Sequence, residues 1–226
     1  MSSPRLLITA GPTHEPIDAV RFLGNRSSGR MGLALAREGV RRGWNVTLLM
    51  GPVGAPVEVA GAAVYRFKTC EDLRGLLNSH VTGADVLIMA AAVADYRPKV
   101  DPALFNGKFR RTSHTLHLEL EPTPDLLAEV ASTRRADQLM VGFALEPREE
   151  LLASARAKLE RKRIDLVVGN PLETMDSESV EAIVLAAGNP GEAPREVRTP
   201  HRMSKTDFAP WLMDQVGAAY AARKPV

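Results

Sequence analysis

The sequence predicts an α/β fold: a three-layer sandwich with a mainly parallel, Rossmann-like sheet and a small antiparallel hairpin extension. Short apolar runs recur along the chain, and a segment of helical character follows each run. The runs are residues 6–9, 46–50, 86–90, 138–143 and 166–169. Residues 86–90 are apolar without alternation, which is typical of a strand covered on both faces in a parallel sheet. The 226 residues, 45% of them hydrophobic, are expected to form one domain over residues 1–226.

The segments between these runs have the patterns of helices. Residues 28–42 place apolar and basic side chains on different faces, as an amphipathic helix does, and Gly43 ends the pattern. Residues 151–163 predict another helix. Two further helices are predicted by a capping residue three positions before an aspartate. These pairs are Thr69 with Asp72 and Ser204 with Asp207.

Two stretches do not fit the alternation of strands and helices. Residues 97–112 are rich in Pro, Lys and Arg, and we expect a mobile flap there, because long loops in compact domains are often functional. Residues 186–200 are rich in Gly and Pro and are expected to form a surface hairpin.

The amino-acid composition argues against several classes of protein. The single cysteine, Cys70, excludes a disulfide framework, and the scattered histidines do not form a zinc-ligand cluster with it. The net charge of +2 and the 5% aromatic content argue against a nucleic-acid partner. Residues 6–8 are too short an apolar run for a signal peptide or a membrane span. We expect a cytoplasmic protein with no nucleic-acid partner and no membrane anchor.

A Gly/Ser loop between the first strand and the first helix predicts a phosphate site. Unpaired amides and the helix dipole point at the same place there, and the phosphate loop is expected to comprise Gly11, Ser27, Ser28 and Gly29. The spacing matches neither the dinucleotide fingerprint nor the P-loop of ATPases. The structural alternative is that Ser27 or Ser28 caps the helix and that Asn25 is a turn residue with left-handed backbone.

Taken whole, residues 11–32 resemble the opening signature of the phosphopantothenoylcysteine synthetase family. The pattern is G-P-T-x-E-P-[ILV]-D-x-V-R-[FY]-[IL]-x-N-x-S-S-G-x-M-G, and every fixed position is present. The resemblance implies that Asn25 is catalytic and holds the carbonyl or the phosphate of an acyl-nucleotide while cysteine attacks. An amide suits this role because it donates and accepts hydrogen bonds without changing charge.

Small residues follow the strand at residues 86–90 and permit a ligand to approach the backbone. Residues 91–96, AAVADY, resemble the family motif A-A-V-A-D-[FWY], which implies that Asp95 contacts the ribose or base of a nucleotide. Met89, Ala90 and Ala91 are expected beside it. The structural alternative is an alanine-rich strand end packed on a helix, with Asp95 as a helix cap.

A basic cluster lies in the predicted flap. Lys108, Arg110 and Arg111 stand where the family has K-x-K-K, so the resemblance implies that Lys108 is catalytic and binds the nucleotide. A mobile cation can meet the charge that builds when a carboxylate attacks an α-phosphate. The alternative is an ordinary solvated basic turn.

Three further segments resemble family motifs that bind the nucleotide. They are Pro124, Asp125, Leu126 and Leu127, then Phe143, then Lys158 and Lys162. The lysines stand one helical turn apart, on one face of the predicted helix. The structural alternatives are that Thr123 caps a helix with Pro124 at its first position, that Phe143 is a core residue, and that the lysines lie on a solvated face.

The resemblance implies a ligase that joins 4′-phosphopantothenate to L-cysteine in coenzyme A biosynthesis. CTP is expected as the co-substrate, with ATP possible, together with Mg²⁺ and a homodimer in which residues 180–185 exchange a strand. Many bacterial relatives carry a preceding flavin-dependent decarboxylase, so the chain is expected to be a stand-alone ligase or an excised domain. Two other functions stay open: a NAD(P)- or flavin-dependent reductase with a variant Rossmann loop, and an inactive nucleotide-binding module.

Overall fold

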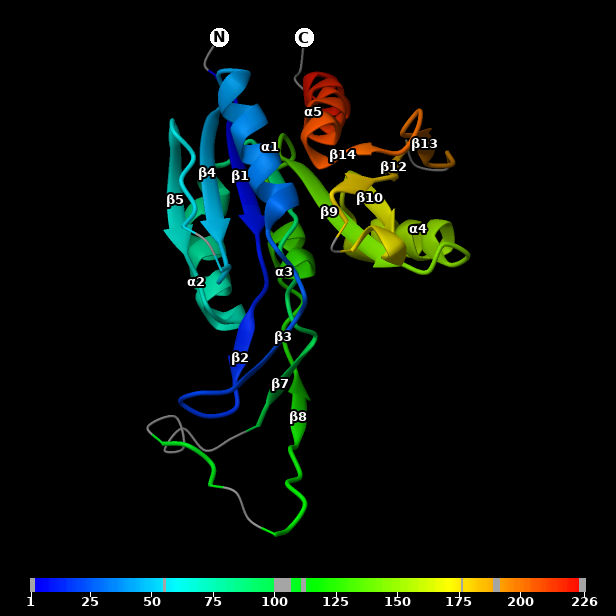
Figure 1. Ribbon diagram of the computed structural model, residues 1–226. Coiled ribbons are helices and arrows are strands. Elements are labelled where there is room, and N and C mark those ends of the chain that lie inside the picture. Colours follow the sequence, from blue (N-terminus) through cyan, green and yellow to red (C-terminus); the bar gives the residue numbers. More distant parts are fainter. Residues whose placement is uncertain are drawn as a thin grey trace.

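An eight-stranded sheet forms the middle layer of the computed structural model, which describes residues 3–54, 56–99, 107–110, 113–175, 177–188 and 192–223 (Figure 1). The strand order is β13-β12-β10-β9-β6-β1-β4-β5. Every pair from β10 to β5 is parallel, and β12 and β13 are antiparallel additions at one edge. The predicted mainly parallel sheet with an antiparallel hairpin is confirmed. The strands are β1 (Arg5–Ala10), β4 (Asn45–Met50), β5 (Ala62–Arg66), β6 (Val86–Met89), β9 (Leu139–Glu146), β10 (Leu166–Pro171), β12 (Ile183–Ala186) and β13 (Arg195–Arg198).

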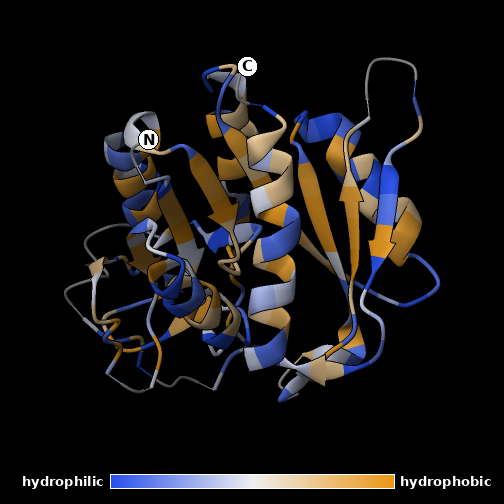
Figure 2. Cartoon of the chain, turned by 90° about the horizontal axis from the view of Figure 1, so that it is seen from above, coloured by the Kyte–Doolittle hydropathy of each residue, from blue (hydrophilic) through white to orange (hydrophobic). Residues whose placement is uncertain are grey.

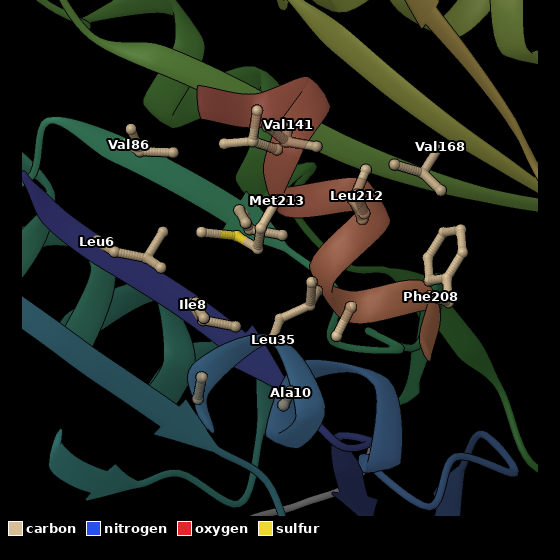
Figure 3. Packing of buried hydrophobic residues seen from close by; sticks show 14 of the residues in the cluster. Leu6, Ile8, Ala10, Leu35, Val86, Val141, Val168, Phe208, Leu212 and Met213 are labelled. Carbon is tan, nitrogen blue, oxygen red and sulfur yellow. The ribbon is translucent and has the colours of Figure 1, made fainter. Parts of the chain in front are cut away.

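Two helices cover one face of this sheet. They are α1 (Arg30–Arg41) and α5 (Lys205–Ala221), whose side chains meet those of β1, β6, β9 and β10 in a continuous apolar cluster (Figure 3). Leu35 of α1 and Phe208 and Leu212 of α5 are completely buried in it. Figure 2 shows the strands as largely hydrophobic ribbons between the helices.

Three helices cover the opposite face. They are α2 (Cys70–His80), α3 (Leu126–Ser132) and α4 (Leu151–Lys162). Leu7 and Leu87 point to this side, whereas their neighbours Leu6 and Ile8 point to α1 and α5, because successive side chains of a strand alternate between faces. Both faces are covered, which accounts for the unbroken apolar strands in the sequence. A short 3₁₀ helix, η1 (Val81–Gly83), follows α2, and η3 (Leu172–Thr174) follows β10.

The predicted caps of α2 and α5 are confirmed. Thr69 Oγ1 accepts the Asp72 N–H at 3.1 Å while the Asp72 carboxylate accepts the Thr69 N–H at 2.9 Å. Ser204 Oγ accepts the Asp207 N–H at 3.0 Å. At α1, however, the serine cap considered as the structural alternative is wrong, because the capping position is Gly29 and it makes no side-chain cap hydrogen bond.

Two other local alternatives are also wrong. The residue that caps α3 is Asp125, which accepts the Ala128 N–H at 3.1 Å, so Pro124 precedes the helix and Thr123 does not cap it. Thr123 Oγ1 instead donates to the Ala94 carbonyl at 2.5 Å. Asp95 begins no helix, because it stands between β6 and the short strand β7 (Tyr96–Pro98).

Short hairpins extend from the ends of the sheet strands. β2 (His14–Pro16) pairs with β3 (Phe22–Gly24), and β7 pairs with β8 (Leu120–Pro122), and both pairs project from one end of the sheet (Figure 1). The predicted flap therefore has a paired base, although residues 100–106 and 111–112 lie outside the described residues. A further pair joins β11 (Ser179–Val180) to β14 (Met203–Ser204).

Candidate functional site

A cavity of about 980 Å³ lies at the carboxyl ends of the parallel strands. This is the edge at which ligands bind in open α/β sheets. Its wall includes the loop before α1, the segment after β6, the start of α3, the end of β9 and one face of α4. Most of the predicted site residues line it: Asn25, Ser27, Ser28, Gly29, Met89, Ala90, Ala91, Asp95, Pro124, Asp125, Leu126, Leu127, Phe143, Lys158 and Lys162.

The amino end of α1 opens into this cavity. Among the described residues no side chain makes a cap hydrogen bond to this helix, and its first turn holds no acidic residue, so amides at the helix start are open to an anion. Gly29 has φ +69°, and a Cβ atom on it would come within 2.5 Å of Met50 Cε. Gly32 is equally close to the sheet, because a Cβ atom on it would lie 2.4 Å from Ala10 Cβ. The two glycines let the helix start against the end of β1, and the arrangement is that of an anion site.

Gly11 was predicted to belong to the phosphate loop, but it is not among the residues that line the cavity. Its φ is +81°, and a Cβ atom on it would lie 3.2 Å from the backbone N of Gly51. Its carbonyl accepts the Ala92 N–H at 2.9 Å, which links the end of β1 to the segment after β6.

Asn25 joins the β2–β3 hairpin to the segment after β6. Its Nδ2 donates to the carbonyls of Ala92 at 3.3 Å and Val93 at 3.0 Å. Its Oδ1 takes no part in these two bonds, and Asn25 is among the residues that line the cavity. Among the described non-glycine residues a positive φ occurs at Arg163, so the left-handed turn considered for Asn25 is wrong.

Two buried threonines that sequence reasoning did not assign to the site hold the same segment. Thr9 Oγ1 accepts the Ala91 N–H at 3.1 Å, and Thr13 Oγ1 accepts the Ala94 N–H at 3.0 Å. Both residues are completely buried. The available signal was a hydroxyl side chain at the end of an apolar strand, where it has to find a backbone partner. The exposed Asp95 follows directly, at the rim of the cavity.

The two lysines of α4 form the cationic wall of the cavity. Lys158 Nζ donates to the Phe143 carbonyl, and burial lowers the pKa of Lys158 to about 8. Lys162 Nζ lies 2.9 Å from Asp125 Oδ1. Burial opposes ionisation of Asp125, but Lys162 and the Ala128 N–H outweigh it and lower the pKa of this carboxyl. Both lysines have partners in the site, so the solvated-face alternative does not describe them.

Lys108 lies apart from the residues that line the cavity. It is exposed in the described segment 107–110, which contacts the loop before β3. Arg110 is also exposed, and Arg111 lies outside the described residues.

Asn170 also lines the cavity, although its sequence did not predict a role in the site. It is 7% exposed at the end of β10, and its Oδ1 has no hydrogen-bond partner among the described residues. Such an acceptor is available to a donor on a ligand. Arg30, Arg161 and Lys205 also line the cavity and add positive charge to its wall.

The described residues hold no cluster of three or more His, Cys, Asp or Glu side chains that could bind a metal ion. No helix in the described ranges has both the length and the apolarity to cross a membrane.

Comparison with known proteins identifies the family of this chain. A family model described as the DNA/pantothenate metabolism flavoprotein C-terminal domain matches residues 1–220. The coenzyme A biosynthesis bifunctional protein CoaBC of Mycobacterium bovis is 42% identical over 179 residues, which are 75% of this chain and 42% of that protein. The chain thus spans less than half the length of this relative.

Two solved structures have the same fold. A crystal structure of the C-terminal domain of CoaBC has a TM-score of 0.75 and 31% identity, over 96% of each chain. A Cab2 mutant in complex with phosphopantothenate-cysteine has a TM-score of 0.77 at 21% identity, over 97% of this chain and 87% of that one, which is a likeness of fold alone. With a family model that matches almost the whole sequence, the chain belongs to the family of DNA/pantothenate metabolism flavoprotein C-terminal domains.

Proposed function

We propose that this chain is a phosphopantothenate–cysteine ligase, which forms the amide bond between 4′-phosphopantothenate and L-cysteine in coenzyme A biosynthesis. One observation carries the proposal: Asn25 is fixed to the segment after β6 inside a cavity that also receives the amino end of α1 and the lysines of α4. The name of the Mycobacterium bovis relative and the ligand of the Cab2 complex support the substrate class.

The proposed reaction has two steps. The carboxylate of phosphopantothenate attacks the α-phosphorus of CTP, and the bond to the β-phosphate breaks, so pyrophosphate leaves. The amine of cysteine then attacks the acyl carbonyl and loses a proton, and CMP leaves with one oxygen of the original carboxylate. A cavity of about 980 Å³ is large enough for a nucleotide beside a second substrate.

The wall of the cavity suggests where each part of the nucleotide would bind. The free amides of α1 and the ammonium groups of Lys158 and Lys162 suit phosphates. Asp95 at the rim suits a ribose hydroxyl, and the half-buried ring of Phe143 suits a base. Asn25 is placed to hold the acyl carbonyl or the α-phosphate as charge develops.

Mg²⁺ is proposed as the companion of the triphosphate. The described residues offer no preassembled cluster of carboxylates, which fits an ion that is held chiefly by phosphates and water with one or two protein oxygens. Glu146 is a lining carboxylate that would serve as a protein ligand. The ion would neutralise negative charge on the phosphates.

The same proposal includes a preference for CTP over ATP and a homodimer. The preference for CTP comes from the resemblance of the motifs around Asp95 and Lys108, and the homodimer comes from the resemblance to a family whose members dimerise. Analytical ultracentrifugation of the purified chain measures its oligomeric state. A chain that sediments as a monomer would contradict the proposed dimer.

The test is the release of pyrophosphate by the purified chain with CTP, 4′-phosphopantothenate and cysteine. We expect release that requires phosphopantothenate, a cysteine-containing product, and slower turnover when ATP replaces CTP. No release, alongside binding of a nicotinamide or flavin cofactor, would favour the reductase. CTP binding without any turnover would favour the inactive module, whereas turnover that collapses in Asn25→Ala and Lys108→Gln would exclude it.

A further inference from the structure

The residues on either side of Lys108 are tied to the loop that precedes β3. The carbonyl of Gly107 accepts the Ala19 N–H at 3.0 Å. The Phe109 N–H donates to the Asp18 carboxylate at 3.0 Å, and the Phe109 carbonyl accepts from Arg21 Nη2 at 3.1 Å. The backbone is therefore held immediately before and immediately after Lys108, while the lysine side chain stays exposed.

The Asp18 carboxylate is the centre of this contact. Its side chain is 1% exposed. It accepts the N–H groups of Val20 at 2.9 Å and Arg21 at 2.8 Å, as well as the guanidinium of Arg21. The Arg21 guanidinium holds the pKa of this carboxyl well below its usual range. A buried carboxylate with this many donors has one conformation, so it is a fixed point for the flap.

Arg21 connects both sides of the contact. Its Nε donates to Asp18 at 2.9 Å, its Nη2 bonds both Asp18 and the Phe109 carbonyl, and its guanidinium carbon lies 5.6 Å from the centre of the Phe109 ring. A planar fork that also stacks on an aromatic ring is a property of arginine and not of lysine.

The same loop leads to Asn25. The Arg21 carbonyl accepts the N–H groups of Ile17 at 2.8 Å and Asp18 at 3.2 Å, which closes the loop into a compact turn. β3 follows, and Asn25 stands directly after it. One rigid turn therefore holds the Lys108 segment at its surface and leads to the amide that is fixed in the cavity.

We propose that Asp18 and Arg21 are positioning residues that anchor the Lys108 segment to the turn leading to Asn25. The inference rests on the proposed function, because Lys108 has its role only in that reaction. Neither residue lines the cavity, and Asn25 has its own bonds to the carbonyls of Ala92 and Val93, so we assign the effect of Asp18 and Arg21 on catalysis to Lys108.

The first test measures the anchor without any activity. Trypsin cleaves after Lys108 and Arg110, and cleavage of a folded protein follows the fraction of time that a segment is open. In the folded full chain we expect Asp18→Asn and Arg21→Lys to speed cleavage at these two sites at least about tenfold. Arg21→Lys keeps the charge at an exposed position, so it serves if Asp18→Asn does not fold.

A second arginine–carboxylate pair provides matched controls. Arg148 Nη1 and Nη2 lie 3.2 Å and 3.3 Å from the two oxygens of Glu181, on the surface and apart from the flap. Glu181→Gln and Arg148→Lys make the same chemical changes there, and we expect cleavage at Lys108 to match the wild type. Equal cleavage rates in the anchor variants and in these controls would overturn the proposal.

The second test asks whether the anchor acts through Lys108. We expect Asp18→Asn to lower kcat for pyrophosphate release about tenfold with the KM for cysteine nearly unchanged. The double variant Asp18→Asn/Lys108→Gln is expected to be no slower than Lys108→Gln alone. Once the Lys108 ammonium is absent, loss of the Asp18 contact has no reacting group left to misplace. Losses that multiply would show a structural effect and overturn the proposal. A wild-type chain that releases no pyrophosphate would refute the proposed function, while the cleavage rates would still decide the anchor.

Discussion

Removal of the buried charge of Lys158 is expected to change how stability depends on pH. Burial lowers the pKa of Lys158 from 10.5 to about 8 in the folded chain, whereas in the unfolded chain the ordinary value of 10.5 applies. Between these values the unfolded chain binds more protons, so the free energy of unfolding rises as the pH rises. The difference between the two pKa values corresponds to about 3 kcal/mol, of which about 2.5 kcal/mol is gained between about pH 7 and pH 10.

The measurement is urea unfolding of the wild type and of Lys158→Met at both ends of this pH range. Other lysines and tyrosines titrate in both proteins, so the difference between the two free energies isolates Lys158. We expect the wild type to gain about 2.5 kcal/mol relative to Lys158→Met as the pH rises. Lys68→Met removes an exposed ammonium and is the control. A difference in free energy of unfolding between the wild type and Lys158→Met that stays constant with pH would refute the burial of this charge.

Four other substitutions test the packing and the site. Gly32→Ala is expected to lower the free energy of unfolding by about 1–3 kcal/mol, because its Cβ would lie 2.4 Å from Ala10 Cβ, and a gain in stability would contradict this packing. Gly217→Ala in the open face of α5 has nothing within 4 Å of the new atom, so urea unfolding should show it stabilised by about 0.5–1 kcal/mol. Phe208→Ala removes a completely buried ring and should cost about 3–5 kcal/mol in the same experiment, whereas a loss below about 1 kcal/mol would contradict its burial. Asn25→Ala should lower kcat about a hundredfold with the KM for CTP little changed, and an unchanged kcat would remove this amide from catalysis.

The central strands and the lysine pair could be predicted from local patterns. An apolar run bounded by helices has few alternatives to a strand covered on both faces, and β1, β4, β6, β9 and β10 followed these runs closely. Lys158 and Lys162 share a face because their spacing matches one helical turn. In both cases the information lies within a few consecutive residues.

The edge strand β5 was not predicted, because its sequence lacks the signal that identified the others. Its residues, Ala62–Arg66, have no fully buried side chain, so they do not form an apolar run. Backbone pairing with β4 defines it instead. The helix predicted over residues 28–42 begins at Arg30 instead, because Gly29 before it has φ +69°, outside the range of a right-handed helix.

The position of Lys108 could not be predicted for the same reason. Its neighbour Phe109 bonds Asp18, which is 91 residues earlier in the chain. No periodicity or capping rule reports such a contact. The burial of Asn170 at the end of β10 likewise depends on the walls that other elements build around it.

Transfer of an oxygen atom from phosphopantothenate to CMP would reveal the acyl-nucleotide intermediate. The carboxylate of 4′-phosphopantothenate is labelled with ¹⁸O, the chain is supplied with CTP and cysteine, and the CMP is analysed by mass spectrometry. Because the carboxylate attacks the α-phosphorus and the amine later displaces CMP, we expect one ¹⁸O atom in each CMP formed. An amide product accompanied by unlabelled CMP would contradict the acyl-cytidylate, and the absence of any amide product would contradict the ligase itself.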